Sequence, residues 1–276
     1  MFTINCRGIL IDLTKPLVMG IINITPDSFY PGSRIHSDGE ALLKIETMIS
    51  EGADIIDIGG QSTRPGSERL SVETELSRVL PIISKAHKQF PNTIFSIDTY
   101  QSVVAEKAVA AGASIVNDIS SGNLDTRMIQ VVASLKVPFI CMHMKGSPEN
   151  MQIEAEYEDI VTEILDFFIY KSHQCKEAGI TDIIIDPGFG FGKTVDQNFL
   201  LLKNMQTFRM LNLPIMAGLS RKYTIYKTLG ITSDTALNGT TVLNTLALNN
   251  GASILRVHDV LAAKEAIVLY KRYRDS

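Results

Sequence analysis

The fold is decided by a short stretch that the sequence repeats, Glu51-Gly52-Ala53-Asp54-Ile55-Ile56-Asp57. In this stretch a glycine can end a helix in the left-handed backbone conformation, and an apolar strand starts within a few residues. Similar stretches occur at residues 111–117, 178–183 and 250–255. A helix, a glycine and a strand in repeated succession predict a chain built from strand–helix units.

Outward from these stretches, short apolar runs alternate with helical patterns from Leu17 to the C-terminus. The predicted strands are residues 17–22, 55–58, 94–97, 115–116, 137–141, 183–185, 214–217 and 254–257. The predicted helices are residues 40–50, 72–89, 101–111, 125–135, 157–178, 197–211, 221–229 with 235–248, and 260–272. Because the strands are unbroken apolar runs, both faces of the sheet should be covered, as in a parallel sheet. Eight such units favour a (β/α)8 barrel, and a doubly wound open sheet is the alternative.

The length and composition fit a single barrel. The chain has 276 residues, of which 45% are hydrophobic and 20% charged, an ordinary globular composition. One-domain barrels commonly hold about 250 residues, so we expect one domain over residues 1–276. Residues 1–15 precede the first predicted strand, and we expect them to form a short β-hairpin that closes the bottom of the barrel.

Charge and cysteine usage argue against several classes of function. A net charge of −4 does not suit binding to nucleic acid or to a membrane surface, both of which favour excess Lys and Arg. The longest uncharged stretch, residues 235–255, carries too many Asn and Thr side chains to span a bilayer. Cys6, Cys141 and Cys175 fit neither a disulfide framework nor a metal clip, and no secretory signal is visible. We therefore expect a protein of the cytoplasm.

A polar residue follows each predicted strand. These residues are Asn23, Asp57, Asp98, Asn117, His143, Asp186, Ser220 with Arg221 and Lys222, and Arg256 with His258. Barrel enzymes place their sites at the C-terminal ends of the strands. One polar residue at a strand end is commonly a helix cap, but a full set converging on one mouth indicates a site.

The polar strand ends are of two kinds. Acceptor-rich side chains from Asp98, Asn117 and Asp186 suit a flat heterocycle with paired N–H donors, because a buried carboxylate needs hydrogen bonds. The second kind is positive and suits phosphate oxygens. Its members are Arg64, Lys222, Arg256 and His258. The alternative is that aspartates and arginines only pair with one another across the mouth.

Two loops combine Gly and Pro with hydroxyl side chains, residues 23–32 and 59–66. Such loops can close over a phosphate, and ordinary surface turns have the same composition. Known nucleotide motifs do not fit. Pro187 stands where a Walker A loop needs glycine, and Lys193 takes the place of the last glycine of GxGxxG. We interpret His143 as a packed strand-end histidine.

Taken together, seven motifs in sequence order resemble the dihydropteroate synthase family over nearly the whole chain. They are Asn23-Ile24-Thr25-Pro26-Asp27-Ser28-Phe29, Ser62-Thr63-Arg64-Pro65-Gly66, Ser96-Ile97-Asp98-Thr99, Val116-Asn117-Asp118, Asp186-Pro187-Gly188-Phe189-Gly190-Phe191-Gly192-Lys193, Ser220-Arg221-Lys222 and Arg256-Val257-His258-Asp259. The resemblance implies a folate-pathway transferase on a (β/α)8 barrel. It would join 6-hydroxymethyl-7,8-dihydropterin pyrophosphate to p-aminobenzoate, releasing pyrophosphate and 7,8-dihydropteroate.

The resemblance also implies roles for individual residues. The pterin would be held by Asp98, Asn117, Asp186 and Lys222, and the pyrophosphate by Thr63, Arg64, Arg256 and His258. The aminobenzoate subsite would comprise Pro65, Phe189, Gly190, Arg221 and Tyr223. Asn23 would ligate Mg²⁺, and Asp98, Arg64, Lys222 and Arg256 would lie closest to the reaction. The resemblance further implies that the protein is a homodimer and that it belongs to a family targeted by sulfonamide drugs.

The chemistry fits this set of residues. Loss of pyrophosphate can precede attack by the amine, through a pterin cation, and such a step needs no enzymatic nucleophile. It needs positive charge on the leaving group, from Mg²⁺, Arg64, Arg256 and His258. Rival hypotheses are a methyltetrahydrofolate-binding methyltransferase barrel and a noncatalytic paralogue that binds pterin.

Two positions depart from the family pattern. Gln61 stands where the family usually has Glu, and Tyr223 stands where it commonly has Ser. The second departure affects the carboxylate end of the aminobenzoate subsite. A helix predicted to start near Arg221 could offer backbone N–H groups to that carboxylate instead, and we expect the Tyr223 ring to turn away.

Overall fold

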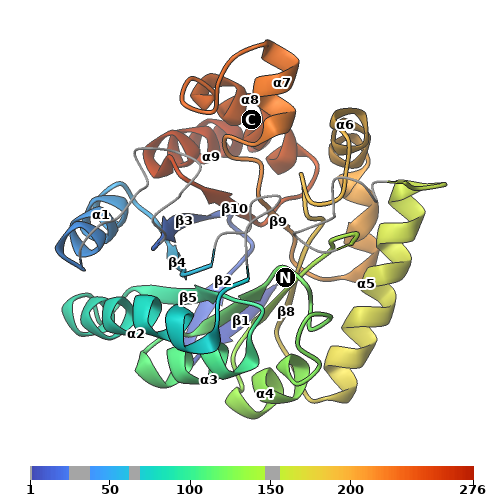
Figure 1. Ribbon diagram of the computed structural model, residues 1–276. Coiled ribbons are helices and arrows are strands. Elements are labelled where there is room, and N and C mark those ends of the chain that lie inside the picture. Colours follow the sequence, from blue (N-terminus) through green and yellow to red (C-terminus); the bar gives the residue numbers. More distant parts are fainter. Residues whose placement is uncertain (1, 25–37, 62–68, 147–155) are drawn as a thin grey trace.

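The computed structural model describes residues 2–24, 38–61, 69–146 and 156–276. At its centre lies a parallel sheet, seen along the barrel axis in Figure 1. Its strands, in spatial order, are β8 (Ile183–Asp186), β7 (Phe139–Met142), β6 (Ile115–Asp118), β5 (Ile94–Asp98), β4 (Ile55–Gly59), β3 (Leu17–Asn23), β10 (Ile254–Val257) and β9 (Met216–Ala217). A parallel bridge between Ile185 and Ile215 joins the two end strands. The predicted (β/α)8 barrel is thus confirmed, and the open sheet is excluded.

Each strand contributes one apolar side chain to a layer that fills the lower barrel. These side chains are Met19, Ile55, Ile94, Ile115, Ile140, Ile184, Met216 and Ile254, all at most 5% exposed. The opposite faces of the strands pack against the helices in a larger apolar cluster. Burial on both faces explains why the strands are unbroken apolar runs in the sequence.

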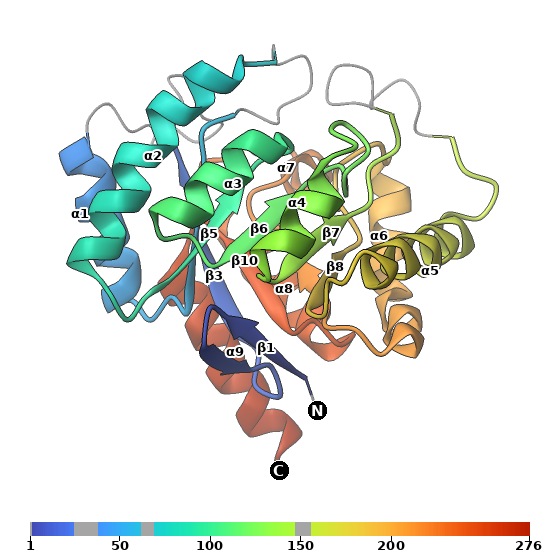
Figure 2. The ribbon, with the colours of Figure 1, turned by 90° about the horizontal axis from the view of Figure 1, so that it is seen from below.

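The predicted N-terminal hairpin is also present. Strands β1 (Thr3–Cys6) and β2 (Ile9–Asp12) pair antiparallel. Ile4, Cys6 and Leu13 are buried in the same cluster as the lower barrel layer. The hairpin therefore covers the end of the barrel at which the strands begin, as Figure 2 shows.

The helices surround the sheet (Figures 1 and 2). They are α1 (Asp38–Ser50), α2 (Val72–Gln89), α3 (Ser102–Ala111), α4 (Met128–Leu135), α5 (Ile160–Glu177), α6 (Val195–Lys203), α7 (Tyr223–Leu229), α8 (Leu237–Asn249) and α9 (Val260–Arg274). The glycines of the repeated stretch, at 52, 112, 179 and 251, all have positive φ, as predicted. No helix in these described segments has the length and apolar character needed to cross a membrane.

Three predicted helices differ from the observed ones by three residues or more at one end, and the others agree within two residues. The one predicted over 197–211 is interrupted at Asn204, after which the 3₁₀ helix η2 (Met205–Leu211) follows. The one predicted from 157 starts at Ile160, because the Asp159 carboxylate accepts the N–H groups of Val161 and Thr162 as an N-cap. The one predicted from 125 starts later, at Met128.

Candidate active site

The strand ends bring together one arginine and two aspartates. Arg256, on β10, donates from Nε to Asp57 Oδ2 at 2.7 Å and from Nη2 to Asp98 Oδ2 at 2.6 Å. Asn117, on β6, donates from Nδ2 to the same Asp57 oxygen at 3.0 Å. Side chains from four strands thus form one hydrogen-bonded network. The pairing of aspartates with an arginine, which the sequence left open as an alternative, does occur at the mouth.

This network places two carboxyl groups around one guanidinium. Asp57 is fully buried, and its second oxygen has no hydrogen-bond partner in the described structure. Burial raises the pKa of Asp98, while Arg256 beside it acts to lower it. Burial would lower the pKa of Arg256, but Asp57 and Asp98 raise it above its ordinary range. Two carboxylates around one guanidinium leave acceptor capacity that a donor-rich ligand can satisfy.

A second group lies at the end of β8. Asp186 is 3% exposed, and its Oδ1 accepts the N–H of Gly188 at 2.8 Å. A Cβ placed on Gly218 would lie 3.7 Å from Lys222 Nζ and 3.8 Å from Asp186 Oδ2. The absence of a side chain at 218 thus leaves space beside both charges. Burial raises the pKa of Asp186, with Lys222 opposing, and burial lowers the pKa of Lys222 to about 8.

The loop after β8 carries the predicted aminobenzoate residues Phe189 and Gly190. The Lys222 ammonium donates to the Phe189 carbonyl and lies 4.7 Å from the centre of the Phe191 ring. The Phe189 side chain is buried, and the Gly190 N–H donates to Asn198 Oδ1 at 2.7 Å. Lys222 therefore connects the two predicted subsites.

Tyr223 and Arg221 have contacts inside the protein. The Tyr223 hydroxyl donates to the Lys193 carbonyl, so the phenol is bonded to the loop after β8, and its turning away from the aminobenzoate carboxylate stays a prediction. The Arg221 guanidinium binds Asp259 through Nε and Nη2, both at 2.8 Å, and donates from Nη1 to the carbonyls of residues 233 and 234. These bonds hold the guanidinium against Asp259 and the chain before α8. The role of Arg221 in the aminobenzoate subsite stays a prediction.

His258 is held by Ser220, whose Oγ lies 3.0 Å from His258 Nδ1. Burial, followed by the charge of Arg256, lowers the pKa of His258 to about 3. The sequence-based hypothesis grouped this side chain with the positive ones, whereas burial keeps the imidazole neutral in the described structure; its role toward pyrophosphate stays a prediction. A neutral imidazole offers a hydrogen bond to a phosphate rather than a charge.

Several predicted residues lie outside the described segments, namely Thr63, Arg64 and Pro65. Gln61, at the edge of that gap, accepts the N–H of Leu70 at 2.7 Å through Oε1. His143 packs against the Phe167 ring at 4.9 Å, and burial lowers its pKa well below the ordinary range. The interpretation of His143 as a packed strand-end residue is confirmed.

Two buried residues had no role in the sequence-based hypothesis. Asp57 was named as a strand end but was given no role, because no local pattern in the sequence reveals that the Arg256 side chain reaches it. Lys193 was set aside with the rejected nucleotide motifs. It is 1% exposed, and four acceptor atoms surround its ammonium. A lysine in a loop of glycine and phenylalanine is a usable signal, since burying it requires backbone carbonyls as partners.

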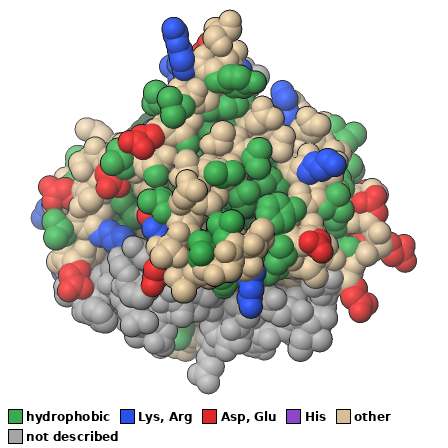
Figure 3. All heavy atoms as spheres, turned by 90° about the horizontal axis from the view of Figure 1, so that it is seen from above, with side chains coloured by type: hydrophobic (Ala, Val, Ile, Leu, Met, Phe, Trp, Pro, Cys, Tyr) green, Lys and Arg blue, Asp and Glu red, His purple; other side chains and the backbone are tan. Residues whose placement is uncertain are grey.

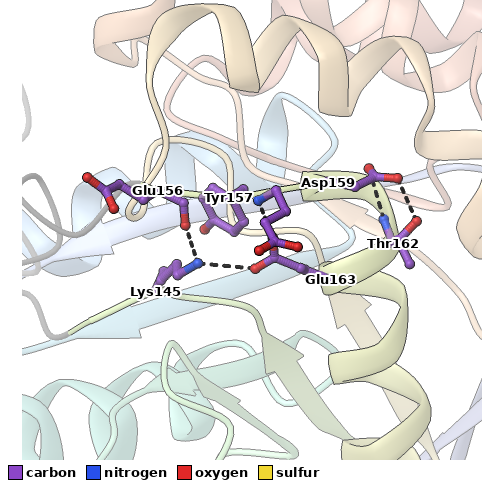
Figure 4. Close-up of a pocket in the computed structure, with 7 residues that line it drawn as sticks. Lys145, Glu156, Tyr157, Asp159, Thr162 and Glu163 are labelled. Atoms are coloured by element: carbon purple, nitrogen blue, oxygen red, sulfur yellow. Dashed lines mark hydrogen bonds and ion pairs between the residues drawn. The ribbon is translucent and has the colours of Figure 1, made fainter.

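A separate hollow of about 880 Å³ lies beside the start of α5 (Figure 4). It is lined by Lys145, Glu156, Tyr157, Glu158, Asp159, Thr162 and Glu163. None of the predicted site residues lines it. Its four carboxylates against one lysine do not suit a phosphate. The mouth, and not this hollow, therefore has the geometry of the active site.

The chain resembles known proteins over nearly its full length. Residues 19–258 match the family described as pterin binding enzyme. The dihydropteroate synthase of Escherichia coli strain K12 is 40% identical over 263 residues, which cover 95% of this chain and 93% of the relative. The structure of Yersinia pestis dihydropteroate synthase with a sulfonamide drug has a TM-score of 0.95 at 36% identity, over 99% of both chains.

A further structural relative is the dihydropteroate synthase of Xanthomonas albilineans in complex with 7,8-dihydropteroate. It has a TM-score of 0.89 at 35% identity, again over 99% of both chains. The sequence and structure comparisons therefore agree over nearly the whole chain. The chain belongs to the pterin-binding enzyme family, as one of its dihydropteroate synthases.

Proposed function

We infer that this chain is the transferase of folate biosynthesis that joins 6-hydroxymethyl-7,8-dihydropterin pyrophosphate to p-aminobenzoate. The products are 7,8-dihydropteroate and pyrophosphate. The observation that carries this function is the 40% identity to a dihydropteroate synthase over 95% of the chain. The Xanthomonas albilineans relative, which holds 7,8-dihydropteroate, supports the same reaction.

The buried acceptors of the mouth suit the pterin ring. We assign its N–H donors to Asp98, Asn117 and Asp186, with Lys222 beside them. A carboxylate has about four lone-pair sites, so Asp98 can keep its bond to Arg256 and still accept from a ligand. The excess of carboxylates over cations around Arg256 favours a ring on which positive charge develops.

We assign the departing pyrophosphate to Arg256 and His258, together with Thr63 and Arg64. Separation of the C–O bond ahead of amine attack requires stabilised charge on the leaving group and no protein nucleophile. Arg256 supplies a fixed positive charge, and neutral His258 supplies a hydrogen bond. The arylamine then attacks the pterin carbon without a strong base.

Mg²⁺ fits this assignment. It takes oxygen ligands and is usually held by one or two side chains together with substrate phosphates. Asn23, half-buried at the end of β3, offers one such oxygen. No cluster of three or more His, Cys, Asp or Glu side chains suited to a metal occurs in the described segments. When bound with pyrophosphate, the ion would supply charge to the leaving group.

Chelation of Mg²⁺ by EDTA is therefore expected to abolish most of the turnover, and added Mg²⁺ to restore it. Asn23→Ala should raise the Mg²⁺ concentration that gives half-maximal activity, because one ligand is lost. Titration of pyrophosphate release with Mg²⁺ measures this. An Asn23→Ala enzyme with the Mg²⁺ dependence of wild type would place the ion elsewhere.

The ionisation of Lys222 predicts an alkaline limit to activity. Its pKa of about 8 means that the ammonium is lost as pH rises through 8. Because kcat/KM reports groups of the free enzyme, kcat/KM should fall above that pH. In Lys222→Arg the guanidinium stays charged, so this limb should vanish although the overall activity is lower. If kcat/KM of Lys222→Arg still falls above pH 8, the titration belongs to another group.

We propose that backbone groups near the start of α7, rather than the Tyr223 phenol, meet the aminobenzoate carboxylate. Tyr223→Phe should then change the p-aminobenzoate KM by less than about tenfold, because the hydroxyl already donates to the Lys193 carbonyl. Tyr226→Phe, on the same helix, is the control. A hundredfold change for Tyr223→Phe alone would assign that contact to the phenol. The same subsite is our candidate for sulfonamide binding, which the Yersinia pestis relative shows.

One assay separates the main hypotheses. Pyrophosphate release with and without p-aminobenzoate should show release that depends on the amine, with 7,8-dihydropteroate formed in equal amount. A noncatalytic pterin-binding protein would release none. A methyltetrahydrofolate-dependent methyltransferase would leave both substrates unchanged and pass a methyl group to cobalamin.

We also propose a homodimer located in the cytoplasm. Figure 3 looks onto the side formed by α7, α8 and α9 and shows apolar side chains gathered at its centre. Helix α8 contains no charged residue. The exposed large apolar side chains of α7, α8 and their connection are Leu229, Ile231, Leu237, Val242 and Leu246. Such a surface favours contact with a second copy. The three free, buried thiols support a reducing compartment.

A further inference from the structure

The loop Gly188–Lys193 is folded around the ammonium of its own last residue. Lys193 Nζ donates to the carbonyls of Gly188 and Phe191, each at 2.9 Å. It also lies 3.1 Å from Nδ1 of His143 and 3.3 Å from the carbonyl of that residue. The ammonium therefore joins both ends of the loop to the end of β7.

A second lysine binds the middle of the same loop. Lys222 donates to the carbonyl of Phe189, which lies between the two carbonyls that Lys193 holds. With the carbonyls of Gly188 and Phe191 directed to Lys193, the Phe189 carbonyl is directed to Lys222. Lys193 and Lys222 thus bind neighbouring carbonyls of one loop.

Further contacts help to keep this loop in one place. A Cβ on Gly188 would lie 1.9 Å from the His143 carbonyl, so the backbone packs directly against the residue after β7. On the other side, the Tyr157 hydroxyl donates to the Gly192 carbonyl at 2.9 Å. Tyr157, labelled in Figure 4, comes from the segment before α5. The Gly188 carbonyl also accepts the N–H of Phe191 at 3.1 Å, and the Lys193 ammonium joins this turn to the Phe191 carbonyl and to His143.

We propose that Lys193 is a positioning residue, which directs the Phe189 carbonyl to Lys222 and thereby fixes Lys222 in the pterin subsite. This inference rests on the proposed function, since it takes Lys222 to bind the pterin. Two loop carbonyls are directed toward Lys193 and one toward Lys222, and this division is what gives Lys193 its positioning role.

The test compares Lys193→Met with Lys171→Met. Lys171, on α5, is also buried, at 6% exposed, and its ammonium donates to Gln174 rather than to the loop. Isothermal titration calorimetry with the pterin pyrophosphate reports affinity and the folded, binding-competent fraction together. Lys193→Met should weaken binding about tenfold or more with a stoichiometry near one, while Lys171→Met should stay near wild type.

A second readout follows Lys222 itself. In Lys193→Met, Lys222 loses its fixed acceptor and gains access to water, so the alkaline limb of kcat/KM should move upward from pH 8. In Lys171→Met it should stay in place. A merely structural role of Lys193 would lower the melting temperature and leave this limb unmoved.

Unchanged affinity in folded Lys193→Met would overturn the proposal, and so would an equal loss in Lys171→Met. If Lys193→Met does not fold, Lys193→Gln keeps an amide donor. An intermediate loss of affinity there supports the proposal, and wild-type affinity overturns it. A wild-type enzyme that neither binds the pterin pyrophosphate nor releases pyrophosphate would instead overturn the proposed function, so the two failures are distinguishable.

Discussion

Arg256→Ala is expected to lower kcat/KM at least about a hundredfold and to destabilise the fold. Among the described residues, the Arg256 guanidinium is the only ion-pair partner of Asp57 and of Asp98. Its removal leaves two buried carboxylates without a cation, a change that typically costs about 3–5 kcal/mol. It also removes the fixed charge that we assign to the departing pyrophosphate.

The two effects can be separated. Urea denaturation measures the stability, and pyrophosphate release measures kcat/KM. Adding Asp57→Asn to Arg256→Ala should recover much of the stability, because one uncompensated charge is gone, but none of the activity. Arg272→Ala, at the exposed end of α9, is the control. Wild-type kcat/KM in Arg256→Ala would mean that the phosphate subsite is misplaced.

Asp186→Asn is expected to weaken binding of the pterin pyrophosphate about tenfold to a hundredfold with a nearly unchanged fold. The amide oxygen can keep the contact with the Gly188 N–H. The amide NH₂, however, places a donor where the ligand and Lys222 both require an acceptor. Calorimetry measures the affinity, and thermal unfolding measures the stability.

The stability expectation follows from the direction of the pKa shift. Burial raises the pKa of Asp186 above the unfolded value of about 4. The folded state therefore loses stability as pH rises from the unfolded pKa to the raised folded one. Asparagine does not titrate, so Asp186→Asn should be at least as stable as wild type at neutral pH. Asp182→Asn, at the other end of β8, is a matched control, since that carboxylate binds Asn5 of the N-terminal hairpin. Unchanged affinity of Asp186→Asn for the pterin pyrophosphate would contradict the assignment of Asp186 to the pterin.

The barrel was predictable because its signals are local. Glycines at 52, 112, 179 and 251 end helices by their own conformational freedom, and the following apolar runs mark strands covered on both faces. The strand ends then identify the mouth without any knowledge of its geometry. The N-cap at Asp159 is a local signal as well. The residues before it also fit a helical pattern, so the start of α5 was predicted a few residues too early.

The pairing inside the mouth was not predictable in the same way. Arg256 lies 199 residues from Asp57 and 158 from Asp98, and their contacts depend on how far each strand extends in the closed ring. The neutrality of His258 arises from burial beside Arg256, which no spacing in the sequence reveals. Lys193 was missed because it was compared only with nucleotide-binding motifs. A lysine among glycine and phenylalanine signals burial against backbone carbonyls, but which carbonyls it binds has no signature in the side-chain sequence.

The bridge that closes the barrel has a mechanical consequence. Between β8 and β9 it is limited to Ile185 and Ile215, whereas β3 and β4 share five paired positions. This narrow seam is where the ring can be deformed with the fewest broken hydrogen bonds. Asp186 stands directly after the seam on one side, and Gly218 and Lys222 follow it on the other. We therefore expect strain applied to the barrel to act first at the subsite that we propose for the pterin, where a small widening would loosen the ligand while the rest of the scaffold keeps its shape.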